Sequence, residues 1–211
     1  MKIDSPIIIG GYSTWISLGI QPTYTSSTSI TFTGVDYTPY FPVGTKIKLT
    51  QTTVKYFYVL SVTYGTNTVL TLTAGSDYSV ANAGITNFNY AHGSAYGFPT
   101  WFSWTPTITY TGGSFDPTSL TTTSKYKLDG SSCSFNIDGY LTRGTGDRAY
   151  IYFTLPINYV SNFAAACYTA VSYNAGVFAY GDSSNKIKLQ LGTPPVMNNS
   201  GIVLISGSYI I

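Results

Sequence analysis

Eight carboxylates and one imidazole are the side chains of this chain that could perform acid–base chemistry. Every acidic residue is Asp, and His92 is the single His. Most of the Asp residues adjoin Gly, Pro, Ser or Tyr, where an Asp usually hydrogen-bonds its own backbone in a turn. Glycoside hydrolysis requires two carboxyl groups, one with a raised pKa, and replacing Asp138 and Asp147 with Asn would test for it. Because Asp138 precedes Gly139 inside a predicted strand, we interpret it as a bulge residue on the polar face.

The remaining reactive side chains do not form a catalytic or metal-binding motif. No Gly-x-Ser-x-Gly elbow accompanies His92, which we interpret as a hydrogen-bonding residue of a connecting segment. Cys133 and Cys167 stand in apolar, strand-like runs, which favours two buried thiols over a disulfide. Two Cys and one His cannot supply the four ligands of a zinc site, and no calcium, phosphate or dinucleotide motif is present. We therefore expect no catalytic residue, no metal and no cofactor.

Tyrosine is the residue type that could instead support binding, since the chain has 20 of them. Aromatic rings stack on the apolar faces of sugars, and polar neighbours can take the sugar hydroxyls. The candidate ligand-binding residues gather around two neighbouring turns and are Tyr168, Tyr173, Asn174, Tyr180 and Asp182. The alternative is that these tyrosines fill β surfaces and subunit contacts.

The elements that must position these side chains are β-strands. Thr and Tyr favour strands, whereas Glu is absent and Lys is sparse, which disfavours exposed helices. Apolar residues alternate in Thr28–Thr33 and in Lys46–Thr50, the period of a half-buried strand. The segment Tyr24–Thr73 predicts a meander of about four strands. We expect an all-β chain whose first domain, residues 1–100, is a small barrel or meander.

The second half of the chain predicts a separate β domain. Residues 87–104 show no period and are rich in turn formers and aromatic residues, which predicts a connecting segment. We place the domain boundary near Trp101 and expect Trp101, Phe102 and Trp104 to pack between the domains. About eight candidate strands follow, so residues 101–211 predict an antiparallel, jelly-roll-like β-sandwich.

The charges and the hydropathy pattern restrict the partners and the location of the chain. The formal net charge is +2, and the basic residues are scattered; Lys46, Lys48 and Lys55 fit the solvent face of a hairpin. This pattern predicts no nucleic-acid binding. Neither a signal peptide nor an apolar run long enough to span a bilayer is present. Export would need another route, such as the release of virus particles by lysis.

Three separated blocks resemble a module of phage and prophage tail proteins. They are Val43–Val59, Gly75–Ile85 and Gly97–Phe102, in the expected order, and the resemblance covers roughly residues 10–105. Residues Trp104–Thr107 and Leu155-Pro156 are similar to short blocks in the β-sandwich tips of tail-fibre proteins. No long shaft of coiled-coil or collagen-like repeats accompanies them, which favours a compact piece near the particle.

The resemblance implies a virion structural protein, synthesised in the host cytoplasm, that takes part in assembly and host attachment. Its expected partners are further copies of itself, in a homotrimer, other virion proteins and a cell-surface glycan. It implies no functional residues. A tail, tail-fibre or spike component is expected first, and a capsid decoration or head-fibre protein is the alternative. The rival from another class is a carbohydrate-binding module or a polysaccharide depolymerase.

Overall fold

The structure is a computed structural model, and it confirms the all-β class expected from the sequence. The residues it describes are 15–111, 121–141, 150–158, 160, 163–169, 178–182, 185–190 and 201–211. The chain divides into two compact units, Met1–Thr100 and Trp101–Ile211. Within the described ranges, no helix is long and apolar enough to cross a membrane.

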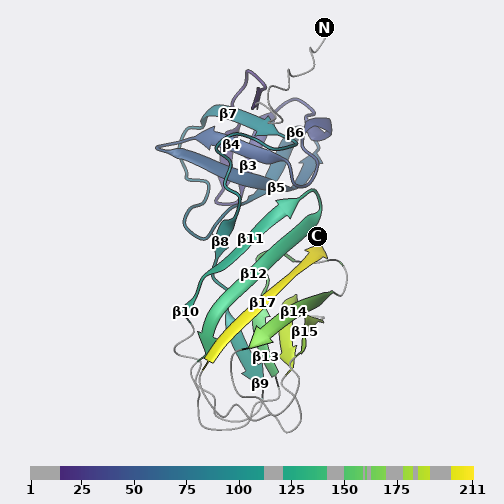
Figure 1. Ribbon diagram of the computed structural model, residues 1–211. Helices are drawn as coiled ribbons and strands as arrows, with labels where there is room; N and C mark the ends of the chain where they lie inside the picture. The colour runs from purple at the N-terminus through teal and green to yellow at the C-terminus, as the bar shows by residue number, and fades with distance from the viewer. Residues whose placement is uncertain are drawn as a thin grey trace. The chain divides into compact units, whose positions relative to one another are not determined.

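The described residues of the first unit form one antiparallel sheet of seven strands, several of which are labelled in Figure 1. Its strands are β1 (Ile16–Ser17), β2 (Thr23–Ser26), β3 (Ser29–Thr33), β4 (Lys46–Thr50), β5 (Val54–Tyr64), β6 (Asn67–Thr73) and β7 (Thr86–Ala91), with a short 3-10 helix, η1 (Thr38–Tyr40). Their order in the sheet is β1-β7-β4-β5-β6-β3-β2. Strands β4, β5 and β6 form a meander, but β3 pairs with β6 rather than with β4. The sheet is open and does not close into the barrel that was one of the two expected forms.

Strand β7 corrects the first part of the expectation that residues 87–104 form an aperiodic connection. Phe88 and Tyr90 are buried, whereas Asn87 and Asn89 alternate with them on the outer face. The segment is therefore a strand of period two, and it pairs with β4 over residues that lie about 40 positions earlier in the chain. That pairing brings the two Asn side chains to the outer face of β4.

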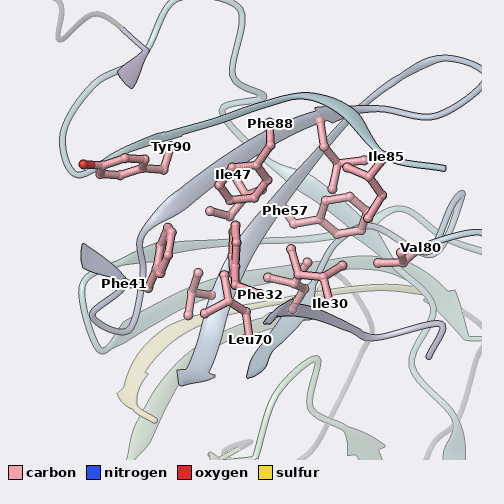
Figure 2. Close-up of a cluster of buried hydrophobic side chains, with 13 residues drawn as sticks. Ile30, Phe32, Phe41, Ile47, Phe57, Leu70, Val80, Ile85, Phe88 and Tyr90 are labelled. Atoms are coloured by element: carbon pink, nitrogen blue, oxygen red, sulfur yellow. The ribbon is translucent and has the colours of Figure 1, made fainter. Parts of the chain in front are cut away.

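The core of the first unit lies on one face of the sheet (Figure 2). Ile47 and Leu49 of β4 are fully buried, as the alternation in the sequence predicts. Phe32 of β3 and Phe88 of β7 meet edge to face with ring centroids 5.1 Å apart, although three strands lie between β3 and β7 in the sheet. The sheet must therefore curl strongly around these rings, and each buried ring contributes about 1.5–3 kcal/mol.

Side chains complete the hydrogen bonding of β5 where the β6 ladder does not reach. The Tyr78 hydroxyl accepts a hydrogen bond from the Tyr56 backbone N–H at 3.3 Å and donates one to the Tyr56 carbonyl at 2.8 Å. Gln51 binds the same connecting segment, because its Nε2 donates to the Ala81 carbonyl and its Oε1 accepts from the Ala81 N–H. Burial of the Tyr78 hydroxyl raises its pKa to about 12. The segment that follows β6 is thus fixed against the edge of β5.

The described residues of the second unit form ten strands in one antiparallel ladder, most of which are labelled in Figure 1. They are β8 (Phe102–Trp104), β9 (Ile108–Thr111), β10 (Thr121–Thr122), β11 (Ser124–Asp129), β12 (Ser132–Leu141), β13 (Tyr150–Thr154), β14 (Ala164–Thr169), β15 (Phe178–Asp182), β16 (Lys186–Gln190) and β17 (Gly201–Ile210). The order is β8-β11-β12-β17-β14-β15-β16-β13-β9, and β10 pairs with β12. Strand β14 pairs with β15 at its start and with β17 over its remaining residues. A strand that changes partners in this way can join two layers, and the arrangement is consistent with a β-sandwich.

The register around β17 also decides the question of a disulfide. Cys133 pairs with Tyr209 and Cys167 with Ile205, four residues apart along β17. This offset alone separates the two positions by about 13 Å, whereas a disulfide needs Cα atoms within about 7 Å. Cys133 is buried and not in a disulfide, and burial raises its thiol pKa to about 11. Cys133 is thus the buried thiol that was expected, and the side chain of Cys167 lies outside the description.

Candidate functional site

An open groove lies on the outer face of the first unit, where β4, β5 and β7 meet the segment around Tyr96. Its volume is about 530 Å³, within the range usual for small-ligand sites. Rings, amides, hydroxyl groups and one ammonium group line it, and the lining residues are Trp15, Lys48, Thr50, Val54, Tyr56, Asn87, Asn89, Tyr96 and Gly97. We call this set the aromatic groove.

A fixed aromatic wall forms one side of the groove. The Trp15 Nε1 donates a hydrogen bond of 2.9 Å to the Tyr96 carbonyl, which ties the segment before β1 to the segment after β7. The Trp15 ring lies 6.1 Å from the rings of both Tyr56 and Phe98. The side chain of Tyr96 projects from this wall and is 85% exposed. An exposed ring held on a fixed backbone is a suitable platform for stacking against a sugar.

The two asparagines of β7 face the same groove. Asn87 adopts a left-handed conformation, with φ of 49°, which Asn tolerates better than most residues. The Asn89 Nδ2 donates a hydrogen bond of 2.7 Å to the Asn87 carbonyl. The side chain of Asn87 is exposed, so its amide can both donate to and accept from a ligand hydroxyl.

Lys48 is the charged group of the groove. Its Nζ lies 4.8 Å from the centroid of the Trp15 ring, a cation–π distance. Partial burial lowers the pKa of Lys48. Lys46, two residues earlier on the same strand, differs because its Nζ donates a hydrogen bond of 2.7 Å to the Gly93 carbonyl. Lys48 makes no hydrogen bond or ion pair with any residue that the structure describes.

The predicted ligand-binding residues that the structure describes belong to the second unit, whereas the aromatic groove belongs to the first. Tyr180 and Asp182 lie on β15, and Tyr168 lies on β14, where its backbone pairs with Leu204. Tyr173 and Asn174 lie outside the described residues, as do the side chains of Tyr168 and Asp182. The structure therefore brings Tyr180 and Asp182 onto one strand and leaves the proposed cluster a prediction.

Tyr180 belongs to a cross-strand arrangement of tyrosines and lysines, which we call the tyrosine–lysine ladder. Lys188 of β16 lies directly opposite Tyr180 of β15 on one side and Tyr152 of β13 on the other. The Lys188 Nζ lies 3.8 Å from the Tyr150 ring centroid and 5.6 Å from that of Tyr180. A hydrogen bond with the Tyr180 hydroxyl raises the pKa of Lys188.

Two of the three aromatics expected between the domains have ring partners within the second unit. Phe102 lies 5.9 Å from the Tyr126 ring, and Trp104 lies 6.2 Å from the Phe135 ring. Phe102 and Trp104 are buried. The Trp101 ring lies 5.0 Å from the Lys127 ammonium. Packing between the domains stays a prediction for all three.

The remaining candidates for chemistry do not converge. Asp138 is exposed on β12, where it pairs with Leu204 without a bulge, so the bulge expected there is absent. His92 follows β7, with its ring 5.4 Å from that of Tyr90. Asp147 lies outside the described residues. Over the described ranges, no three His, Cys, Asp or Glu residues are grouped as metal ligands would be.

The arrangement in the first unit is suited to holding a polar ligand with ring faces, by stacking and hydrogen bonding. Sequence reasoning missed it, although the alternation Asn87-Phe88-Asn89-Tyr90 was available as a signal for a strand with outward amides. Comparisons with family models, curated proteins and solved structures find no match for the chain.

Proposed function

We propose that this chain is an adhesive structural protein of a bacteriophage virion, which binds a cell-surface glycan through the aromatic groove of its first unit. The observation that carries the proposal is the exposed Tyr96 ring beside the outward amides of Asn87 and Asn89. Sugar sites combine an aromatic platform with a few amide or hydroxyl groups that fix orientation. The wall behind Tyr96 is fixed by the Trp15 hydrogen bond, which limits the entropy lost on binding.

The virion assignment is supported by composition and by the resemblance to phage tail proteins. Charged residues make up 9% of the chain, which suits contacts that must persist at varied salt concentrations. The block Val43–Val59 of the resemblance contributes Lys48, Thr50, Val54 and Tyr56 to the groove. The chain acts as a homotrimer with other virion proteins, in a tail, fibre or spike. A place as a capsid decoration or head fibre is the alternative.

The experiment for adhesion is glycan binding by the full-length chain. Binding to an array of bacterial surface glycans should fall at least about tenfold with Tyr96→Ala and with Asn87→Ala, since each removes a direct contact. Tyr64→Ala is the matched control, because Tyr64 is also exposed (47%) but lies outside the groove. Binding to no glycan, or an equal loss with Tyr64→Ala, would contradict the proposal.

Two further measurements separate this proposal from its rivals. Antibody labelling of purified particles should detect the chain and place it on the tail or the head. Light scattering at micromolar concentration should give a trimer, whereas a monomer that binds glycans would favour an independent carbohydrate-binding module. Release of new reducing ends from a bound polysaccharide would identify a depolymerase instead.

A further inference from the structure

We propose that the aromatic groove selects an acidic glycan, whose carboxylate pairs with the ammonium group of Lys48. The inference rests on the proposed function and names the class of sugar that this site takes. It is carried by the state of Lys48 within the groove rather than by the overall charge of the protein.

Lys48 is a cation whose hydrogen-bonding capacity is not used. An ammonium group carries three N–H donors, and those of Lys48 have no oxygen partner among the described residues. The other lysines of the β4–β5 hairpin are bonded. Lys46 donates to the Gly93 carbonyl, and Lys55 donates to the Ser79 carbonyl at 2.7 Å and to the Gln51 Oε1 at 3.2 Å. Lys48 is therefore the cation of this hairpin that is left to bind an external anion.

The surroundings of Lys48 make its charge costly until an anion arrives. The Trp15 ring lies 4.8 Å from the Lys48 Nζ, and Tyr56 lies opposite Lys48 on β5; Val54 lines the same groove. Removing water from an unpaired charge is unfavourable, and a carboxylate would restore the lost interaction with a charge-assisted hydrogen bond. No acidic residue belongs to the lining of the groove, so a carboxylate of the ligand would not compete with one of the protein there.

The register of the strands provides the other contacts that an acidic sugar needs. Lys48 lies directly opposite Asn89 of β7 and Tyr56 of β5. These three residues span about 10 Å across the sheet. One rung thus presents an amide, an ammonium group and an aromatic ring in sequence. A sugar along this rung would place its carboxylate at Lys48 and its hydroxyls at the amide.

The test compares glycans that differ only in the carboxylate. Oligosaccharides of galacturonate, glucuronate, mannuronate and sialic acid are each titrated beside their carboxyl-reduced forms, with the full-length chain and by calorimetry. At least one acid should bind about tenfold or more tightly than its reduced form, as one charge-assisted hydrogen bond implies. Lys48→Met should abolish this preference, and Lys48→Arg should retain most of it.

Lys46→Met is the matched control. It removes the same charge from the same face of β4, and Lys46 also lies against an aromatic ring, 5.5 Å from the Phe98 centroid. An equal loss of preference in Lys46→Met and Lys48→Met would indicate unspecific attraction and overturn the inference. Equal binding of acids and reduced forms would also overturn it while leaving the proposed function standing. Binding of no glycan at all would remove both. Circular dichroism of each variant verifies that the fold is retained.

Discussion

Lys48 in the first unit and Lys188 in the second have similar aromatic neighbours, but their pKa values shift in opposite directions. Each lies on the outer face of an antiparallel strand, opposite a tyrosine and close to an aromatic ring, 4.8 Å from Trp15 and 3.8 Å from Tyr150. Burial lowers the pKa of Lys48, whereas the hydrogen bond with the Tyr180 hydroxyl raises that of Lys188. The position of a lysine over aromatic rings therefore does not by itself determine the direction of its pKa shift.

What separates the two sites is whether an oxygen of the described neighbours accepts a hydrogen bond from the ammonium group. In the tyrosine–lysine ladder, cross-strand neighbours provide both the rings and a hydroxyl, so Lys188 is satisfied within its own sheet. In the aromatic groove, the strand neighbours of Lys48 provide a ring and an amide, but the N–H groups of its ammonium make no hydrogen bond to the described residues. The tyrosine–lysine ladder stabilises its sheet, whereas the aromatic groove leaves an ammonium group that can bind a ligand.

The largest expected effect tests whether the groove depends on the curl of its sheet. Phe32→Ala removes the ring that packs against Phe41 and Phe88. It should lower the free energy of unfolding by about 3–5 kcal/mol, measured by urea denaturation, and weaken glycan binding. Phe32→Leu, which keeps most of the volume, is the control and should cost less than half as much. A loss below about 1 kcal/mol for Phe32→Ala would show that these rings do not hold the sheet.

A smaller effect is expected from the Tyr78 hydroxyl behind the groove. Tyr78→Phe leaves the N–H and C=O of Tyr56 without their partner and should lower stability by about 1–3 kcal/mol. Tyr64→Phe is the control, since Tyr64 is exposed, and it should change stability by less than about 0.5 kcal/mol. Equal effects of the two variants would contradict the role given to Tyr78.

Tyr78→Phe should also change the pH dependence of unfolding. The pKa of Tyr78 is raised to about 12 in the folded chain, so the folded state holds this proton more tightly than the unfolded state. Its contribution is fully present below pH 10 and is lost as the pH rises toward 12. Urea midpoints between pH 9 and 12 should therefore fall less steeply for Tyr78→Phe than for the parent chain.

The sequence predicted those parts of the fold that local alternation specifies. Ile47 and Leu49 are buried as expected, and the alternating segment Lys46–Thr50 is strand β4. The groove was not predictable in this way. It needs the pairing of β7 with β4 and the contact of Trp15 with Tyr96, 81 residues away in the chain. Local patterns carry no information on such distant partners.

Replacing either of the two lysines, Lys48 or Lys188, with Met is expected to change stability by still less. Lys188→Met removes a cation from several rings and should destabilise the chain by about 0.5–1 kcal/mol, the usual contribution of an exposed cation–π contact. Lys48→Met should leave stability nearly unchanged, because the loss of its cation–π contact with Trp15 is offset by the removal of a partly buried ammonium group that makes no hydrogen bond to the described residues. Urea denaturation of both variants checks this contrast, and equal losses would remove the distinction between the two sites.

The smallest expected effects are the pKa shifts of Lys48 and Lys188. Measuring them tests why the two lysines differ. By NMR of lysine side chains, Lys48 should titrate below the ordinary value of 10.5 and Lys188 above it. For Lys48 the unfolded state binds the proton more tightly, so its contribution to stability rises with pH between the folded pKa and 10.5. For Lys188 the sign is opposite, and stability present below pH 10.5 is lost as the pH rises through the folded pKa.

A bound acidic glycan should raise the pKa of Lys48 and leave that of Lys188 unchanged, because a carboxylate stabilises the ammonium group that it contacts. A shift of both, or of neither, would show that Lys48 does not receive the anion.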